Sequence, residues 1–301
     1  MTDLIILGNG MAGMTAALYA KRANLDFKLI GFDEYEYGQI GKAILVENYP
    51  CAASRSGFDL ADGLHDQLLA NNIRVIEETV SSIEKEDGTF RVNCKSGNLF
   101  TAKAIIYACG CRHRELPNIE KNPSIHYCAI CDGPLYKDKR AAVIGGGDVA
   151  FTQAEYLSGI CSDVRIIMCD HNVTASPSTF ERVSKIHNVH IDYDCPVLSI
   201  SRNQGTNWIM CKGVRGPIFA EGIFIAIGMI PNTEPLNGEC SEILNKQGYI
   251  MATESGATTI PGLFAAGDVR CKSLRQAITA AADGAYSVNA VTEYLKGLKS
   301  F

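Results

Sequence analysis

The sequence predicts an α/β fold with two dinucleotide-binding domains, each a three-layer arrangement of helices around a parallel sheet. An apolar strand, a glycine turn, an alanine-rich helix and a second strand ending in an acid occur in this order at residues 3–34 and again at 140–170. The interval from the first glycine to the closing acid is the same in both copies. Two βαβ units of this kind predict two Rossmann-like domains. Alternating apolar residues at 88–94 and 207–213 predict antiparallel strands beside them.

The order of these segments predicts that one domain is inserted into the other. The polar, proline-containing stretch "RHRELPNIEKNP" (112–123) is typical of a crossover linker, and "AIGMIPNTE" (226–234) is a second candidate. The last sixty residues contain "GLFAAGDVR" (262–270) and then a pattern that predicts a helix from Ser273 to about Leu298. We therefore expect the C-terminal segment to close the first domain after the second has been inserted.

Composition narrows the class of protein. The chain has 301 residues, of which 47% are hydrophobic and 20% charged, as in an ordinary globular protein with room for two cores. The formal net charge of −5 argues against a general nucleic-acid binder. There is no apolar run of the roughly 20 residues that span a membrane. The N-terminus "MTDLIILGNG" enters a strand directly, so we expect a mature, cytoplasmic protein without membrane contact.

The first glycine loop, "GNGMAG", fits the G-x-G-x-x-G pattern between a strand and a helix. Gly8 permits the tight turn, Gly10 lets a pyrophosphate approach the backbone, and Gly13 allows close packing of helix on strand. The helix N-terminus adds free N–H groups for an anion. Asp33 or Glu34 can accept a hydrogen bond from a ribose hydroxyl. The alternative is a glycine turn that serves packing alone.

A second turn, "AAGD" (265–268), places Gly267 and Asp268 before another predicted helix. The aspartate can simply cap that helix. It can also bond a ribityl hydroxyl of a flavin, and the neighbouring motifs favour this second interpretation.

The segment "YCAICDG" holds Cys128 and Cys131 at C-x-x-C spacing, with Asp132 directly behind. This spacing suits dithiol–disulfide exchange. A zinc site would need further ligands, and the other close pair, "CGC" (109–111), has a single intervening residue, so we expect no metal. Inert structural cysteines are the remaining alternative. Asp132 is either a general acid that protonates a departing thiolate or a turn former before Gly133.

Together these stretches resemble the low-molecular-weight thioredoxin reductase family, nearly end to end. The matching stretches are "GNGMAG" (8–13), "VENYP" (46–50), "CAICDG" (128–133), "GGGDVA" (145–150), "IGMIPNTE" (227–234) and "GLFAAGDVRCKSLRQAITAAADGA" (262–285). The resemblance implies a homodimer with an FAD domain at 1–113 and 245–301 and an inserted pyridine-nucleotide-type domain at 117–241. It implies that Cys128 and Cys131 form the redox disulfide, with Cys131 facing the flavin, Cys128 attacking thioredoxin and Asp132 as the acid.

The same resemblance implies the FAD contacts. They fall on the two glycine turns, the acids after the second strand, and matching positions along the rest of the chain: Gly8, Gly10, Met11, Ala12, Gly13, Asp33, Glu34, Gln39, Asn48, Val80, Gly110, Gly267, Asp268, Arg275, Gln276 and Ala277. Two positions depart from the family, since Cys109 stands where threonine is usual and Tyr37 where glycine is usual.

The second domain departs further from the family pattern, at the end of the strand that binds the adenosine ribose. Members that use NADPH carry a His-Arg-Arg run with another arginine four residues on, whereas here these positions read Met168, Cys169, Asp170 and Thr174. Losing two charge-assisted hydrogen bonds costs about 3–6 kcal/mol, or roughly two to four decades of affinity. NADPH is therefore disfavoured. NADH stays open, because Asp170 can bond an unphosphorylated ribose and the loop from Gly145 can still hold pyrophosphate.

Because it lacks the basic residues that bind the nucleotide, the chain resembles the ferredoxin-dependent flavin thioredoxin reductases of this family. Plant-type ferredoxins lie about 130 mV below thioredoxin, which is roughly 6 kcal/mol over two electrons. FAD joins the one-electron donor to the two-electron disulfide. An acidic ferredoxin calls for a basic patch, and the sequence offers Arg112–Arg114, or Arg270 with Lys272 and Arg275.

Reduction of thioredoxin with electrons from ferredoxin is thus the leading hypothesis. The alternatives are an NADH-dependent thioredoxin reductase, a flavin dithiol oxidase that passes electrons to oxygen, and a non-catalytic redox sensor.

Overall fold

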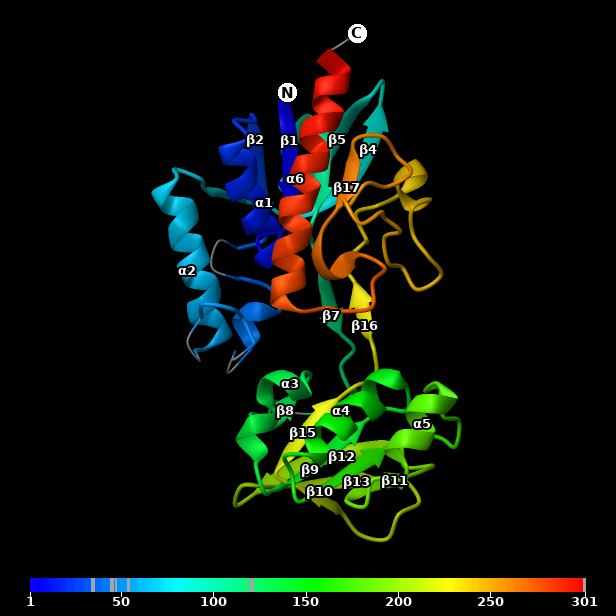
Figure 1. The fold of residues 1–301 in the computed structure, drawn as a ribbon. Coiled ribbons are helices and arrows are strands. Elements are labelled where there is room, and N and C mark those ends of the chain that lie inside the picture. The colour runs from blue at the N-terminus through cyan, green and yellow to red at the C-terminus, as the bar shows by residue number, and fades with distance from the viewer. Residues whose placement is uncertain are drawn as a thin grey trace. The chain divides into compact units, whose positions relative to one another are not determined.

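A computed structural model describes residues 1–33, 36–43, 46, 48–52, 55–117, 119 and 122–299, and it divides into two compact units (Figure 1). Unit 1 comprises Met1–Arg112 and Ile230–Phe301, and unit 2 comprises His113–Met229. The chain thus crosses between units inside the two linker candidates given above, 112–123 and 226–234. The second crossing lies earlier than the resemblance implied, because Leu236 and Cys240 pack in a core cluster of unit 1.

Unit 1 is built on a seven-stranded sheet of order β3-β2-β1-β6-β5-β4, with β17 paired to β6. Its central strands pair in parallel, while β4 and β5 form the antiparallel part. Residues 4–7 are apolar and fully buried, as expected for a strand covered on both faces. The strands are β1 (Thr2–Leu7), β2 (Phe27–Gly31), β3 (Val75–Glu77), β4 (Val80–Glu86), β5 (Thr89–Cys94), β6 (Leu99–Tyr107) and β17 (Leu263–Ala265).

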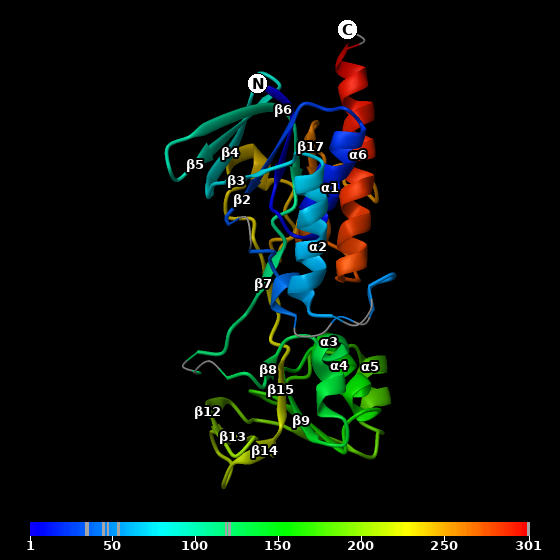
Figure 2. The same cartoon turned by 90° about the vertical axis from the view of Figure 1, so that its left-hand side faces the viewer.

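Helices α1 (Met11–Arg22), α2 (Gly57–Ala70) and α6 (Ala277–Lys299) lie side by side on one face of this sheet (Figures 1 and 2). Small residues let α1 and α6 approach closely: a side chain at Gly284 would meet the Ala12 carbonyl oxygen at 2.2 Å. Helix α6 begins four residues later than predicted. The Arg275 guanidinium donates to the carbonyls of Asp268 and Arg270, which holds the preceding residues in an irregular turn.

Unit 2 repeats the parallel arrangement on a smaller scale, with a five-stranded sheet of order β11-β10-β9-β15-β8. Its strands are β8 (Ile125–His126), β9 (Arg140–Ile144), β10 (Asp163–Ile167), β11 (Val189–Asp192) and β15 (Gly222–Ile225). Helices α3 (Ala129–Asp132), α4 (Asp148–Ser158) and α5 (Pro177–Val183) belong to the same unit. A separate antiparallel sheet contains β12 (Val197–Asn203), β13 (Thr206–Cys211) and β14 (Ile218–Ala220).

Short elements complete the chain. Strands β7 (Cys111–His113) and β16 (Met229–Pro231) contain the two crossings and pair with each other. The short 3-10 helices are η1 (Ile40–Lys42), η2 (Gly133–Tyr136), η3 (Gly238–Ser241) and η4 (Gly267–Val269). The predicted α/β fold with two Rossmann-like domains is confirmed.

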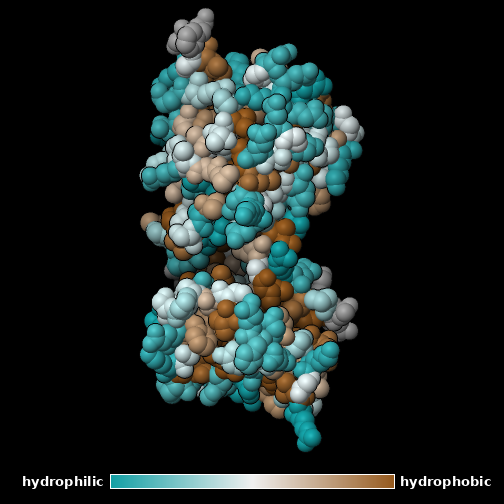
Figure 3. All heavy atoms as spheres, turned by 90° about the vertical axis from the view of Figure 1, so that its right-hand side faces the viewer, coloured by the Kyte–Doolittle hydropathy of each residue, from teal (hydrophilic) through white to brown (hydrophobic). Residues whose placement is uncertain are grey.

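The surface is mixed in character. On the face drawn in Figure 3, hydrophilic side chains alternate with apolar ones over both units. Among the residues that the structure describes, no helix combines the length and apolar character needed to cross a bilayer.

Candidate active site

The glycine loop of unit 1 joins β1 to α1 and leaves the start of α1 open. The Gly8 N–H donates to the Ile30 carbonyl, and a side chain on Gly13 would lie 1.7 Å from the Gly8 oxygen, so helix and strand meet here without room for a methyl group. Within the described residues, no side chain caps α1 at Gly10 and its first turn holds no acid. The uncapped N–H groups and the positive end of the helix are thus available to a pyrophosphate.

The acid expected at the ribose lies beside this loop. Asp33 follows β2, and its carbonyl accepts a 2.6 Å hydrogen bond from the Asn9 side chain. Glu34, the other expected acid, lies outside the described residues. Val80 begins β4, and the N–H of Glu78 just before it donates to Gly31 at the end of β2.

The turn at residues 265–268 brings a buried acid to the same helix start. Gly267 has a φ of +79°, and a side chain on it would clash with the Ala12 methyl at 2.9 Å. Burial raises the pKa of Asp268, and Oδ1 of this residue has no hydrogen-bond partner among the described residues. A buried carboxylate oxygen that lacks a hydrogen bond, with Lys272 Nζ 3.9 Å away, fits the hydroxyl of a bound polyol.

Several of the other expected flavin contacts are joined to this turn by hydrogen bonds. The Gln39 amide donates to the Cys111 carbonyl at 3.1 Å, and the Cys111 thiol donates to the Asp268 carbonyl at 3.0 Å. Arg275 donates to the same carbonyl at 3.1 Å. The remaining contacts lie nearby in unit 1: Asn48 bonds the Gln276 side chain at 3.1 Å, Ala277 begins α6, and Asn232 donates to the Gly110 carbonyl at 3.0 Å.

The two departures from the family are accommodated differently. Tyr37 is buried in contact with α2, where its hydroxyl donates to Asp62 at 2.7 Å and its ring packs on Phe58. Cys109 keeps its proton, since burial raises the pKa of its thiol to about 12.

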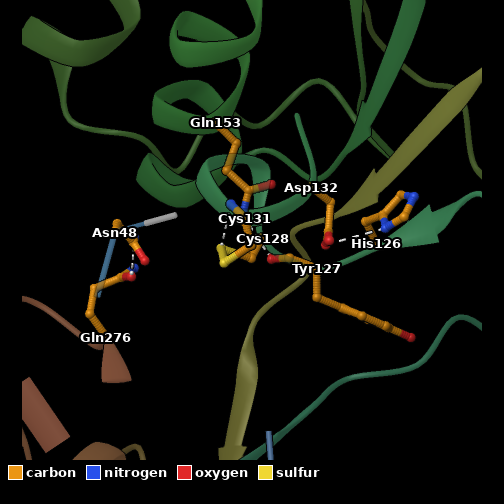
Figure 4. Close-up of a disulfide and its surroundings, with 8 residues drawn as sticks. All are labelled: Asn48, His126, Tyr127, Cys128, Cys131, Asp132, Gln153 and Gln276. Carbon is orange, nitrogen blue, oxygen red and sulfur yellow. Dashed lines mark hydrogen bonds and ion pairs between the residues drawn. A yellow bond between two sulfur atoms is a disulfide. The ribbon is translucent and has the colours of Figure 1, made fainter. Parts of the chain in front are cut away.

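In unit 2, Cys128 and Cys131 form a disulfide across α3 (Figure 4). Their Cα atoms are 5.3 Å apart, a usual separation for a disulfide. Cys128 is the N-cap residue of α3, and its sulfur accepts from the Cys131 N–H at 3.3 Å. Gln153 of α4 helps to hold the backbone just before Cys128, because its amide donates to the Tyr127 carbonyl at 3.0 Å.

Asp132, next to the disulfide, is buried and has one engaged and one unengaged oxygen. Oδ2 lies 3.2 Å from Nδ1 of His126, which is also buried (Figure 4). Oδ1 has no hydrogen-bond partner among the described residues. A carboxyl group beside a redox disulfide with one oxygen unengaged can carry a proton to or from a thiolate.

The glycine loop of unit 2 differs from that of unit 1 at the helix start. Asp148 is the first residue of α4, and its Oδ1 accepts 2.9 Å hydrogen bonds from the N–H and the hydroxyl of Ser176. These bonds lower the pKa of Asp148, so the carboxylate is ionised at neutral pH. The Gly146 carbonyl accepts from both the N–H and the hydroxyl of Thr174. The segment after β10 is thus bonded onto the loop where a nucleotide would bind.

Comparison with known proteins places the chain in a family. Residues 2–284 match the family model "Pyridine nucleotide-disulphide oxidoreductase". Thioredoxin reductase of Treponema pallidum is 33% identical, over 99% of this chain and 98% of that protein. The chain belongs to the low-molecular-weight thioredoxin reductase family. A solved thioredoxin reductase from Streptococcus pyogenes has a TM-score of 0.88 at 33% identity, with 99% of each chain covered.

A ferredoxin-flavin thioredoxin reductase from Clostridium acetobutylicum shares the fold, with a TM-score of 0.57 at 24% identity over 100% of this chain and 99% of that one. The family match and the relatives above 30% identity show that the protein is a flavin-containing disulfide oxidoreductase that acts as a thioredoxin reductase, with FAD as its cofactor. The uncapped start of α1 and the Asp268 oxygen that lacks a hydrogen bond fit this cofactor.

The basic residues that the sequence offered for docking are largely engaged inside this thioredoxin reductase. Arg270 is 7% exposed and pairs with Asp283, as does Lys272, so these two do not form a surface patch. The Arg275 guanidinium lies over the Tyr249 ring at 4.3 Å. The second predicted patch is therefore wrong, because its charges hold the turn beside Asp268.

Two residues of the thioredoxin reductase were missed in the sequence. Asp148 was visible as an acid directly after three glycines, and an acid in the first helical turn opposes an anionic ligand. His126 gave no signal, since a single histidine before a cysteine motif has no spacing that marks a partner. Its contact with Asp132 arises only when β8 and α3 fold against each other.

Proposed function

We propose that this thioredoxin reductase receives its electrons from reduced ferredoxin and passes them through FAD and Cys128–Cys131 to thioredoxin. The observation that carries the proposal is the segment after β10, where residues 168–176 contain no lysine or arginine although family members that use NADPH carry arginines there. A contrast between the two glycine loops adds to it. Helix α1 begins without a cap or an acid, whereas α4 begins with the ionised carboxylate of Asp148. The start of α1 is therefore free of negative charge, whereas the start of α4 carries the carboxylate of Asp148.

Asp148 adds a negative charge where a nicotinamide cofactor would bind, although this acid belongs to the "GGGDVA" stretch that matches the family. NADH and NADPH share the pyrophosphate, which binds at the N-terminus of the helix after the glycine loop. The carboxylate of Asp148 repels the pyrophosphate and weakens the attraction of the positive end of α4 for it. NADPH is disfavoured further, because residues 168–176 contain no lysine or arginine to bind the 2′-phosphate.

The proposed roles of the site residues follow thiol chemistry. FAD, when bound, accepts electrons one at a time and delivers them in pairs. The Cys128–Cys131 bond takes up two electrons and two protons to give two thiols, with Asp132 supplying a proton to the departing thiolate. The thiolate of Cys128 then attacks the thioredoxin disulfide, and Cys131 displaces the reduced thioredoxin and restores the bond.

A second candidate donor is NADH, and Asp170 is the observation that favours it. This acid follows β10, where dinucleotide domains bond the adenosine ribose. Its Oδ1 already accepts a 2.8 Å hydrogen bond from the Asn172 N–H, which keeps the carboxylate turned to its own loop.

Anaerobic reduction of the enzyme tests the proposal. The oxidised holoenzyme is mixed separately with NADPH, NADH and reduced ferredoxin, and flavin bleaching is followed. We expect rapid bleaching with ferredoxin and little with either nucleotide. Bleaching by NADH at a rate that supports turnover, without response to ferredoxin, would overturn the proposal.

A charge-removing variant tests the reason behind it. Asp148→Asn should increase NADH binding and bleaching. Asp138→Asn is the matched control, since it removes an equal charge from unit 2 at a left-handed position (φ 60°) that asparagine tolerates. Equal nucleotide binding by both variants would show that Asp148 does not exclude the pyrophosphate.

A further inference from the structure

A buried histidine bonds the acidic residue of the redox motif. His126 ends β8, and its side chain is 3% exposed. Nδ1 lies 3.2 Å from Oδ2 of Asp132, and Nε2 lies 2.6 Å from the hydroxyl of Tyr136 (Figure 4 shows the first contact). We propose that His126 is a positioning residue for Asp132: it holds Oδ2 and leaves Oδ1 to exchange a proton with the redox thiols.

The direction of the two hydrogen bonds follows from Tyr136. Burial raises the pKa of this phenol, so it keeps its hydrogen and can donate it to Nε2 of His126 at 2.6 Å, while Ser124 is a second hydrogen-bond partner of the hydroxyl. A ring nitrogen that accepts leaves the hydrogen of the neutral imidazole on Nδ1, which donates to Asp132. The chain of donors thus runs from Tyr136 through His126 to Oδ2.

Of the groups described around the His126 ring, Asp132 is the one with a carboxyl in contact with the imidazole. Helix α3 contributes Asp132, η2 contributes Tyr136, and β15 contributes the apolar ring of Phe224, whose centroid is 5.4 Å from that of His126. Arg202 of β12 acts on the Tyr136 hydroxyl by charge. Oδ1 of Asp132 is the oxygen without a partner among the described residues.

This arrangement makes the buried carboxyl able to release its proton. When a thiolate of the pair is protonated, the Oδ1–H bond breaks, an S–H bond forms, and the negative charge moves from sulfur to the carboxylate. No electrons are transferred in this step. The hydrogen bond from Nδ1 stabilises the carboxylate in a site away from water, where an unpartnered charge is costly. The imidazole therefore favours transfer of the Oδ1 proton to the thiolate.

The inference rests on the proposed role of Asp132 as the acid and does not depend on the electron donor. Enzyme fully reduced with dithionite is mixed anaerobically with oxidised thioredoxin over a range of pH, and flavin absorbance reports the re-reduction of the disulfide. The rate should fall as the pH rises through a midpoint. Asp132→Asn should slow this step by about 10²–10⁴-fold.

Replacing the histidine should move the midpoint. His126→Phe removes both nitrogens and with them the hydrogen bond to Oδ2, so the rate should begin to fall at a higher pH than in the wild-type enzyme. His126→Asn places an amide donor near the position of Nδ1 and should restore the wild-type midpoint. The matched control is His190→Phe, which breaks a 3.1 Å pair with Asp163 in the same unit and should leave the midpoint unchanged.

The outcomes separate the two claims. A wild-type midpoint in His126→Phe, with Asp132→Asn slow, would overturn the role of His126 and retain that of Asp132. Full activity of Asp132→Asn would overturn the acid itself. If His126→Phe fails to fold, Tyr136→Phe provides the test, because loss of the hydroxyl frees Nε2 to take the hydrogen and should raise the midpoint; an unchanged midpoint there would contradict the proposed chain of donors.

Discussion

Asp283→Ala should destabilise unit 1 by about 3–5 kcal/mol, because it leaves a buried charge without its partner. Asp283 accepts hydrogen bonds from Arg270 at 2.6 Å, from Lys272 at 2.9 Å and from the Gly267 N–H at 2.9 Å. The side chains of Arg270 and Asp283 are 8% and 13% exposed. Alanine removes all three contacts and leaves the Arg270 guanidinium in a site closed to water.

The size of the effect is set mainly by Arg270. Lys272 has a second acid, Asp268, at 3.9 Å, so part of its pairing survives. Arg270 loses its carboxylate and keeps a 2.6 Å bond to the Thr253 carbonyl. At roughly 2–4 °C per kcal/mol for a domain of this size, the loss corresponds to a decrease in Tm of about 6–20 °C. Thermal unfolding of the holoenzyme, followed by flavin release, measures it.

Two further variants decide whether the reasoning holds. Glu155→Ala breaks an ion pair with Arg182, whose side chain is 52% exposed, and should cost no more than about 1 kcal/mol. The double variant Arg270→Met, Asp283→Leu removes both buried charges and should recover most of the lost stability. A loss in Asp283→Ala no larger than that in Glu155→Ala, or no recovery in the double variant, would refute the argument.

Three other expectations concern the flavin site and the thiols. Gly13→Ala should abolish FAD retention, measured by flavin content after gel filtration, while Gly63→Ala, in open space on α2, should keep FAD and raise stability by about 0.5–1 kcal/mol; equal flavin content in both would contradict this. Burial raises the pKa of Asp268, so its contribution to stability is greatest below the ordinary pKa and falls as the pH rises through the raised value. Asp268→Asn should therefore increase the Tm of the apoprotein at pH 7 and not at pH 3, and calorimetry that finds the same gain at both would exclude the explanation. A thiol reagent should label the exposed Cys51, Cys169 and Cys271 in the oxidised enzyme, and reduction should add the two redox thiols; failure of reduction to add them would contradict a reducible disulfide.

The architecture was predictable because its signals are local. A strand, a glycine turn and a helix repeat within short stretches, and the clash at Gly13 explains why that glycine is required. The C-x-x-C pair is likewise a contact between near neighbours in the chain. These features need no knowledge of what lies across the fold.

The contacts that could not be predicted join residues far apart or depend on exact packing. Asp148 meets Ser176 only after α4 and α5 are both in place. Lys272 was expected at the surface, yet it is turned inward by an acid on α6 that lies beyond the predicted turn. The partners of these acids lie far away in the sequence, so the pairs can be identified only once the tertiary structure is known.

The unequal helix starts also have a consequence for the life of the protein in a cell. Helix α4 begins with its own carboxylate, so the fold of unit 2 gains this stabilisation from the chain itself. Helix α1 has no such group, and a ligand that binds only the native state adds to stability in proportion to the logarithm of its concentration. When flavin is scarce, we therefore expect unit 1 to lose this stabilisation and to become more accessible to proteases, whereas α4 keeps its own carboxylate.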